Sequence, residues 1–227
     1  MPARSISSIR RSELSQAAFE AVIRFGLRGT TLEKIGQIAG VSKGVVLHHF
    51  KDKSTLLEAV FRRSNSILSD SVIELYQHAE TPYERLWAIV VANFFDTIFN
   101  RRVCQAWVSL ISEVPHNVNC QRIQTACNAR IDSNFRHELK HFLNKDDTAS
   151  VARHLGLLID GIWMRAGLQP EPLASQTAIS EIEYAILKLL PSNKQSIAKH
   201  AAARQKMENV AGILLTSKAY KEQALQS

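Results

Sequence analysis

Apolar positions recur at helical spacing along almost the whole chain, and no stretch shows the sustained alternation of apolar and polar residues that a strand would have. Near the N-terminus they fall at i, i+3, i+4, i+7, i+8 and i+11, and Gly26 follows as a helix stop. The residues expected to share this buried face are Leu14, Ala17, Ala18, Ala21, Val22 and Phe25. The pattern predicts an all-α protein that begins with this amphipathic helix.

Two short helices are predicted directly after the first. Residues Thr30–Glu33 have the form of a capping box, so a helix is expected to start there and to end at Gly40. Ser42 can cap a third helix that runs from Lys43 to about Phe50. Two short helices joined by a tight turn predict a helix-turn-helix, whose second helix can lie in the major groove of DNA.

The rest of the chain predicts a larger helical body. A long helix is expected after the cap Asp52, another after Thr81-Pro82, and four more over residues 102–113, 120–143, 148–168 and 175–190. Residues 151–168 are apolar nearly all round, which is typical of a helix that packs on its own core and on a second subunit. We therefore expect a homodimer formed through this helix and the next. The positions of that next helix expected at the interface are Ile179, Ile182, Ile186 and Leu189.

Charge is distributed unevenly along the 227 residues, whose formal net charge is +7. Residues 1–63 hold eleven Lys and Arg against five Asp and Glu, residues 64–190 eleven against fourteen, and residues 191–227 six against two. A basic segment ahead of a mildly acidic body predicts that one end meets a polyanion. We expect a three-helix DNA-binding domain over residues 1–53, a ligand-binding and dimerisation domain over 54–190, and a basic helical extension over 191–227.

Composition excludes several classes of protein. The longest apolar stretches are about half of the ~20 residues that a bilayer span needs, and no apolar run follows the basic N-terminus as in a secretory signal. We therefore expect a cytoplasmic protein with no membrane contact. Three cysteines in such a chain predict free thiols rather than a disulfide framework.

The helix-turn-helix carries a dense set of signature residues, namely Gly29-Thr30-Thr31, Ile35, Ala39 to Gly44, His48-His49-Phe50, Lys53 and Leu56-Leu57. Their order and spacing resemble the TetR family of transcriptional regulators. The resemblance implies that the helix from Lys43 enters the major groove, that Thr31 and Lys53 face phosphate, and that the other helices form a ligand pocket and a dimer interface. The residues it assigns to DNA binding are Thr31, Ser42, Lys43, Gly44, Val45, His48, His49 and Lys53.

Two signature positions depart from the family. Leu47 stands where tyrosine is frequent, and Gly36 stands where alanine is usual. Leu47 lies on the predicted reading helix, so the family resemblance does not give the operator sequence.

Three stretches also resemble the choline-responsive branch of the TetR family: residues 9–11, residues 88–107 in part, and above all residues 158–166. This resemblance implies a repressor that is released by choline and controls genes of betaine synthesis or uptake, without catalytic activity, cofactor or metal. A regulator that answers to a different amphipathic ligand is the alternative within the family.

A quaternary ammonium group is held by aromatic faces and a nearby carboxylate. Asp160 and Trp163 are three residues apart on one helix, so both can point into one cavity. The ligand-binding residues expected on this basis are Trp87, Phe94, Trp107, Asp160 and Trp163. The competing interpretation is that the aromatic residues only fill the core, and that Asp160 pairs with an arginine across a dimer.

One enzymatic motif is also present. Residues 137–141 have the H-E-x-x-H form of zinc metalloproteases, in which two histidines bind the metal and the glutamate is the base. His137, Glu138 and His141 thus define an alternative function as a zinc-dependent hydrolase. Arg136 and Lys140 surround the motif with positive charge, which favours a solvated helix face instead.

Overall fold

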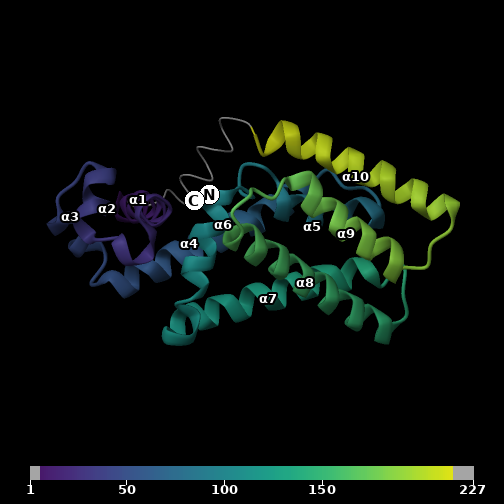
Figure 1. Cartoon of the computed structure of the whole chain (residues 1–227), viewed down its shortest axis with the longest axis horizontal. Coiled ribbons are helices and arrows are strands. Elements are labelled where there is room, and N and C mark those ends of the chain that lie inside the picture. Colours follow the sequence, from purple (N-terminus) through teal and green to yellow (C-terminus); the bar gives the residue numbers. More distant parts are fainter. Residues whose placement is uncertain (1–5, 217–227) are drawn as a thin grey trace.

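Residues 6–216 are described by a computed structural model, and every regular element in this range is helical (Figure 1), which confirms the all-α prediction. Residues 1–5 and 217–227, which hold the start of the basic N-terminal segment and the end of the expected extension, lie outside the described residues. The elements are α1 (Ile6–Gly29), α2 (Leu32–Ala39), α3 (Lys43–His49), α4 (Lys53–Tyr76), α5 (Pro82–Phe94), α6 (Arg101–Ile111), η1 (Val114–His116), α7 (Val118–Leu139), α8 (Lys145–Leu168), α9 (Ser175–Leu189) and α10 (Lys194–Leu214).

Helices α1 to α3 form the head of the protein, and the helices from α4 to α10 form its body. The two short helices of the head, α2 and α3, begin where side chains satisfy their free backbone amides. Thr31 caps α2 and Ser42 caps α3, each by accepting a hydrogen bond from an amide three residues on. The expected capping box at Thr30 is wrong by one residue, because Thr30 is buried and its hydroxyl donates to the Gly26 carbonyl. Gly40 ends α2, as predicted.

The first helix differs from the prediction at its C-terminal end. The chain kinks at Gly26, whose φ is +66°, but helical structure resumes and α1 ends at Gly29. Phe25, expected on the buried face, is exposed, and its ring lies 4.3 Å from the Lys34 ammonium. The other predicted positions of this face are buried.

A shared hydrophobic cluster joins the head to the body. It combines head residues such as Leu14, Val46 and Phe50 with Ala106 and Leu110 of α6 and with the first turns of α7. Helix α4 also continues from the head into the body (Figure 1). The head is therefore packed on the body through a common core, and α4 is not its only connection.

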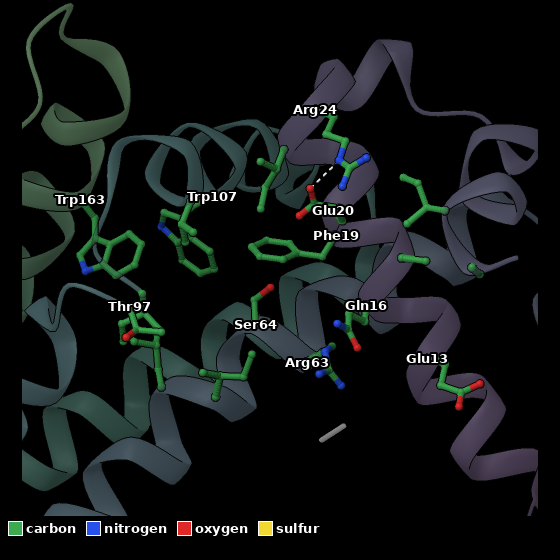
Figure 2. Close-up of a pocket in the computed structure, with 18 of the residues that line it drawn as sticks. Glu13, Gln16, Phe19, Glu20, Arg24, Arg63, Ser64, Thr97, Trp107 and Trp163 are labelled. Carbon is green, nitrogen blue, oxygen red and sulfur yellow. Dashed lines mark hydrogen bonds and ion pairs between the residues drawn. The ribbon is translucent and has the colours of Figure 1, made fainter. Parts of the chain in front are cut away.

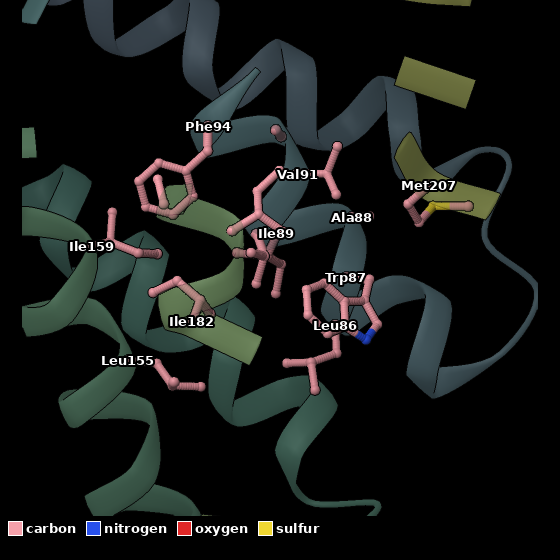
Figure 3. Close-up of a cluster of buried hydrophobic side chains, with 14 of the residues drawn as sticks. Leu86, Trp87, Ala88, Ile89, Val91, Phe94, Leu155, Ile159, Ile182 and Met207 are labelled. Carbon is pink, nitrogen blue, oxygen red and sulfur yellow. The ribbon is translucent and has the colours of Figure 1, made fainter. Parts of the chain in front are cut away.

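Helix α5 forms the centre of the larger hydrophobic cluster (Figure 3). Thr81 and Glu84 form a capping box at its start. Every residue from Leu86 to Phe94 is buried, so this stretch has no side that faces solvent. Helices α4, α7, α9 and α10 all pack on it.

The apolar side of α9 is used within the chain. Ile179, Ile182 and Ile186 are buried in the larger cluster, whereas Leu189 is exposed. The prediction that these isoleucines lie at a subunit interface is therefore wrong, because α9 needs them to cover α5. On α8, one side packs on α6, α7 and α9, and the opposite side exposes apolar residues.

The extension contains a long helix, α10, which packs along α5. In its N-terminal part, His200 is 3% exposed and accepts a hydrogen bond on Nδ1 from the Trp87 indole at 3.2 Å. The Tyr83 ring meets the imidazole edge-on, with ring centroids 4.7 Å apart. The residues of α10 buried against the body with His200 are Ala203, Met207 and Ala211. The extension is helical from Lys194 to Leu214.

The three cysteines are buried as free thiols, as predicted. Burial raises the pKa of Cys104 to about 12 and also raises the pKa values of Cys120 and Cys127. These thiols are therefore poor nucleophiles at neutral pH. Among residues 6–216, no helix has the length and apolar content needed to cross a membrane.

The environment of His200 predicts a loss of stability in acid. Burial lowers the pKa of His200 from 6.5 to about 4, so protonation favours the unfolded chain. The stabilisation that depends on the neutral ring is complete above pH 6.5 and is lost as the pH falls toward 4. We expect this group to remove about 2 kcal/mol of unfolding free energy between pH 8 and pH 5.

Urea unfolding at pH 8 and pH 5 measures this effect. His200→Gln keeps a hydrogen-bond acceptor for Trp87 but cannot titrate, so its stability should fall by about 2 kcal/mol less than that of the wild type. His78→Gln, at an exposed position, is the matched control and should leave the pH dependence unchanged. An identical pH dependence in His200→Gln and the wild type would contradict the assignment.

Candidate functional site

The first candidate site is the outer face of α3. Val46 and Phe50 are completely buried and fix α3 on the rest of the head. The residues left exposed on or beside the opposite face are Ser42, Lys43, Gly44, Leu47 and His48, and Val45 is half-buried. A short helix fixed on one side and exposed on the other has the form of a DNA-recognition helix.

The turn before α3 is tight because of Gly36. The Val41 amide donates to the Gly36 carbonyl at 2.8 Å. A Cβ atom at position 36 would lie 2.6 Å from the Val41 carbonyl oxygen, so an alanine at this position would force the turn to open. The departure from the family's usual alanine therefore reflects closer packing of α2 against the turn.

Cationic groups cluster around the recognition helix. The Lys43 ammonium lies 2.9 Å from Glu33 of α2 in an exposed ion pair, which DNA phosphate can replace at little cost. Arg11 donates to the His49 carbonyl at 3.2 Å, and its guanidinium stacks over Phe50. Partial burial and the nearby cationic groups lower the pKa of His49, whereas His48 is exposed.

Two residues assigned to phosphate contact already have structural partners. The Thr31 hydroxyl caps α2, as described above. The Lys53 ammonium, at the start of α4, donates to the Leu27 carbonyl at 3.0 Å and ties α4 to the end of α1. Both residues therefore help to set the position of the helix termini in the head.

The second candidate site is a cavity of about 890 Å³ between the head and the body (Figure 2). Helices α1 and α2 form one wall, and the other is formed by α4, α6, α8 and the segment 97–98. Phe19 of α1 points toward Trp107 of α6, and Trp163 of α8 lies beyond Trp107 (Figure 2). Two of the five expected ligand-binding residues, Trp107 and Trp163, thus line one cavity.

A chain of aromatic contacts supports the body wall of this cavity. Trp107 stacks on Phe61 of α4 with ring centroids 5.4 Å apart, and its centroid lies 6.1 Å from that of Trp163. The Trp163 indole donates to the Asn93 carbonyl at 3.2 Å and meets Phe99 edge-on. Both tryptophans are therefore held in fixed orientations.

The other two aromatic residues of the expected site lie elsewhere. Phe94 is completely buried behind Phe99, with ring centroids 5.1 Å apart, and does not line the cavity. Trp87 lies in the larger hydrophobic cluster (Figure 3), where its indole donates to His200. For these two residues the core-filling interpretation fits the structure, because α5 has no exposed side.

Asp160 does not share a cavity with Trp163 in this structure. The two residues are three apart on α8, but Trp163 is buried whereas Asp160 is exposed on the outward side of the helix. Asp160 is not among the residues that line the cavity. Side chains three residues apart on a helix point about 60° apart around its axis. Here this difference is enough to place the Asp160 carboxylate outside the cavity.

The H-E-x-x-H motif does not form a metal site. Glu138 is 1% exposed and faces the core, where its carboxylate lies 3.1 Å from Arg85 and 2.9 Å from His137. His137 and His141 are exposed, with ring centroids 6.4 Å apart. Within residues 6–216, no group of three or more potential ligands could hold a metal ion. The zinc-hydrolase alternative is therefore overturned, because its base is used in an internal ion pair.

A small head with an exposed recognition helix, packed on a helical body with an aromatic-walled cavity between them, defines a DNA-binding regulator that responds to a small molecule. Residues 14–60 match the family model described as "Bacterial regulatory proteins, tetR family". Residues 82–191 match the model described as "BetI-type transcriptional repressor, C-terminal". The chain belongs to the TetR family of transcriptional regulators and has a BetI-type C-terminal domain.

Relatives in that family match over most of the chain. The HTH-type transcriptional regulator BetI of Escherichia coli K12 is 34% identical over 196 residues, which covers 85% of this chain and 100% of that protein. BetI of Pseudomonas aeruginosa PAO1 is 35% identical over 184 residues, which covers 79% and 92%. These relatives are transcriptional regulators and not enzymes. Helix α10 follows the region that the family models match.

Solved structures show the same fold at lower identity. A TetR transcription regulator from Haloarcula marismortui superimposes with a TM-score of 0.73 at 20% identity, covering 80% of this chain and 98% of that chain. A transcriptional regulator from Saccharomonospora viridis, solved in complex with choline, gives a TM-score of 0.70 at 17% identity, covering 81% and 98%.

Exposed donors on α3 predict a loss of operator affinity when they are removed. Lys43→Ala and His48→Ala should each cost about 1 to 3 kcal/mol on specific DNA, because each removes an exposed donor from the side of α3 that is expected to face DNA. Lys145→Ala, which removes an exposed lysine from the far end of the body, is the matched control and should bind normally. Fluorescence anisotropy with operator DNA at two salt concentrations measures both affinity and salt slope. Wild-type affinity in both α3 variants would remove these residues from the reading surface.

Proposed function

We propose that this regulator is a homodimeric repressor that a small cationic effector releases from its operator, in the cytoplasm where the operator DNA lies. The two heads bind a near-palindromic site with half-sites about one helical turn, ~34 to 36 Å, or slightly more, apart. Residues Thr31, Ser42, Lys43, Gly44, Val45, His48, His49 and Lys53 form or support the DNA-contacting surface. The observation that carries this proposal is the cavity lined both by the reading head and by Trp107 and Trp163 of the body.

The proposed effector class is a quaternary ammonium compound, with choline as the first candidate. The quaternary ammonium group of such a compound has no N–H to donate and gains ~0.5 to 2 kcal/mol from an aromatic face, which Trp107 and Trp163 supply. The BetI-type body and the S. viridis regulator solved with choline support the same class. A choline-responsive regulator of this type would control genes of betaine synthesis or uptake.

Release follows from the coupling of two binding equilibria. An effector that prefers one arrangement of head and body weakens DNA binding if the other arrangement fits the two half-sites. Linkage then requires the operator to weaken effector binding by the same factor, typically ~1 to 3 kcal/mol. Because the cavity lies at the junction between the head and the body, its occupancy affects their relative position directly.

The proposed dimer forms through the outward side of α8 and the adjacent side of α9. This side carries exposed apolar residues at helical spacing, a pattern that a monomer would leave in water. The residues of this surface, called the seam here, are Leu157, Gly161, Met164 and Leu168 of α8 and Tyr184 of α9. A stable seam would bury at least about 1,200 to 2,000 Å².

The aromatic wall predicts effector binding that depends on the two tryptophans. Calorimetry with choline should show binding to the wild type. Choline at 100 times its dissociation constant should raise the free energy of unfolding by ~2.7 kcal/mol. Trp107→Ala and Trp163→Phe should weaken choline binding while operator binding without choline persists, because both residues lie in the cavity wall. Trp87→Phe, in the larger hydrophobic cluster beside His200 and outside the cavity, should leave choline affinity unchanged.

If choline is not the effector, a parallel thermal-shift screen of betaine, betaine aldehyde and unrelated amphiphiles should identify it. An absence of heat with choline at millimolar concentration, together with unchanged operator release, would mean that the regulator responds to a different amphipathic molecule.

The seam predicts which substitutions make the protein monomeric. Leu157→Glu and Met164→Glu each place a charge in the middle of the proposed interface and should give monomers at micromolar concentration in sedimentation velocity. Ile73→Glu, at an exposed isoleucine of α4 outside the seam, is the matched control and should remain dimeric. A wild-type protein that sediments as a monomer at this concentration would rule out the dimer.

A further inference from the structure

The head side of the cavity is lined by charged residues of both signs, with Arg10 and Arg24 beside its carboxylates, whereas the body side has no carboxylate. Among the lining residues, the carboxylates are Glu13 and Glu20, and both belong to α1 of the head. The body contributes Trp107 and Trp163, the hydroxyls of Ser64 and Thr97, and the Arg63 guanidinium, but no carboxylate. A cation that binds the aromatic wall therefore finds an opposite charge only on the head.

Glu20 is the carboxylate placed near the aromatic wall. Glu20 directly follows Phe19, which points toward Trp107. Glu13 lies nearer the N-terminus of α1 and further from Trp107 (Figure 2). Glu20 also contacts the body directly, because its Oε1 lies 4.0 Å from the Arg102 guanidinium of α6. Glu13 instead pairs with Arg10 of its own helix at 2.8 Å.

The present partners of Glu20 are weakly held. Arg24, four residues along α1, lies 2.5 Å from the carboxylate, and both Arg24 and Arg102 have side chains that are more than half exposed. Exposed ion pairs of this kind contribute at most about 1 kcal/mol. A cation between the carboxylate and the indole of Trp107 can replace these contacts, because it meets an aromatic face and an opposite charge together.

We propose that Glu20 of the DNA-reading head is the counter-charge for the cationic effector, so that one ligand binds the head and the body at the same time. The proposal rests on the proposed function for the class of effector, and adds the residue that recognises its charge and the route of its action. The effector then competes with Arg102 for Glu20 and replaces a contact between α1 and α6 with a contact through the ligand. Effector charge thereby acts on α1 directly.

Calorimetry on the full-length protein with two probes tests this proposal. The probes are choline and 3,3-dimethylbutanol, which has the same shape without the charge. In Glu20→Gln the affinity for choline should fall about tenfold or more, because a partly desolvated cation loses its counter-charge. The affinity for the neutral alcohol should stay within about twofold of the wild type.

Three further variants serve as controls. Glu13→Gln makes the same chemical change on the same helix and should alter choline affinity less than about twofold. Asp160→Asn, on the seam side of α8, should also leave it unchanged. Arg102→Ala removes a competitor at an exposed position and should tighten choline binding by about threefold, which tests the idea even if Glu20→Gln is unstable.

A second readout measures the route of action. Saturating operator DNA should weaken choline binding to the wild type by a measurable factor, since linkage is reciprocal. In Glu20→Gln, operator DNA should weaken choline binding by a smaller factor. Choline affinity that is equal in Glu20→Gln and the wild type, or that falls in Asp160→Asn instead, would overturn the role of Glu20 while leaving the effector class intact. An absence of choline binding to the wild type would overturn the effector class and this proposal together.

Discussion

The complete burial of α5 is the constraint on which the rest of the body depends. A helix with no solvent-facing side from Leu86 to Phe94 must be covered from every direction. Helix α9 therefore uses its isoleucines to cover α5, and α10 covers a further side through the contact of His200 with Trp87. With α9 used in this way, the exposed apolar residues that follow one side of a single helix at helical spacing are Leu157, Met164 and Leu168 of α8, and this is why the proposed seam centres there.

A similar need to cover apolar side chains explains the junction between the head and the body. The head is too small to enclose its own core, so its apolar side chains continue into α6 and the start of α7. Helix α6 thus contacts the head core through Ala106 and Leu110 while presenting Trp107 to the cavity. A ligand in contact with Trp107 therefore contacts the helix on which the head is packed.

Much of this arrangement could be predicted from the sequence, because it is encoded locally. Caps such as Ser42, Asp52 and Thr81 set the starts of α3, α4 and α5, and the helix-turn-helix follows from residues that are adjacent in the chain. The error at Thr30 arose because two threonines in succession offer two possible caps, and only the burial of Thr30 decides between them.

The cavity could be predicted only in part, because tertiary packing decides which residues face it. On α8 the spacing of Asp160 and Trp163 alone does not decide which of them faces the cavity. The polar residues of this helix mark its outward side together, because Arg153, His154, Asp160 and Arg165 are all exposed. Glu20 had no signal of its own, since a glutamate four residues before Arg24 on an amphipathic helix is an ordinary surface pair. Its importance comes from the opposing wall, where Trp107 and Trp163 carry no counter-charge. A search for the missing charge of an aromatic site should therefore include the neighbouring domain, because a carboxylate supplied from there makes ligand binding and domain position a single equilibrium.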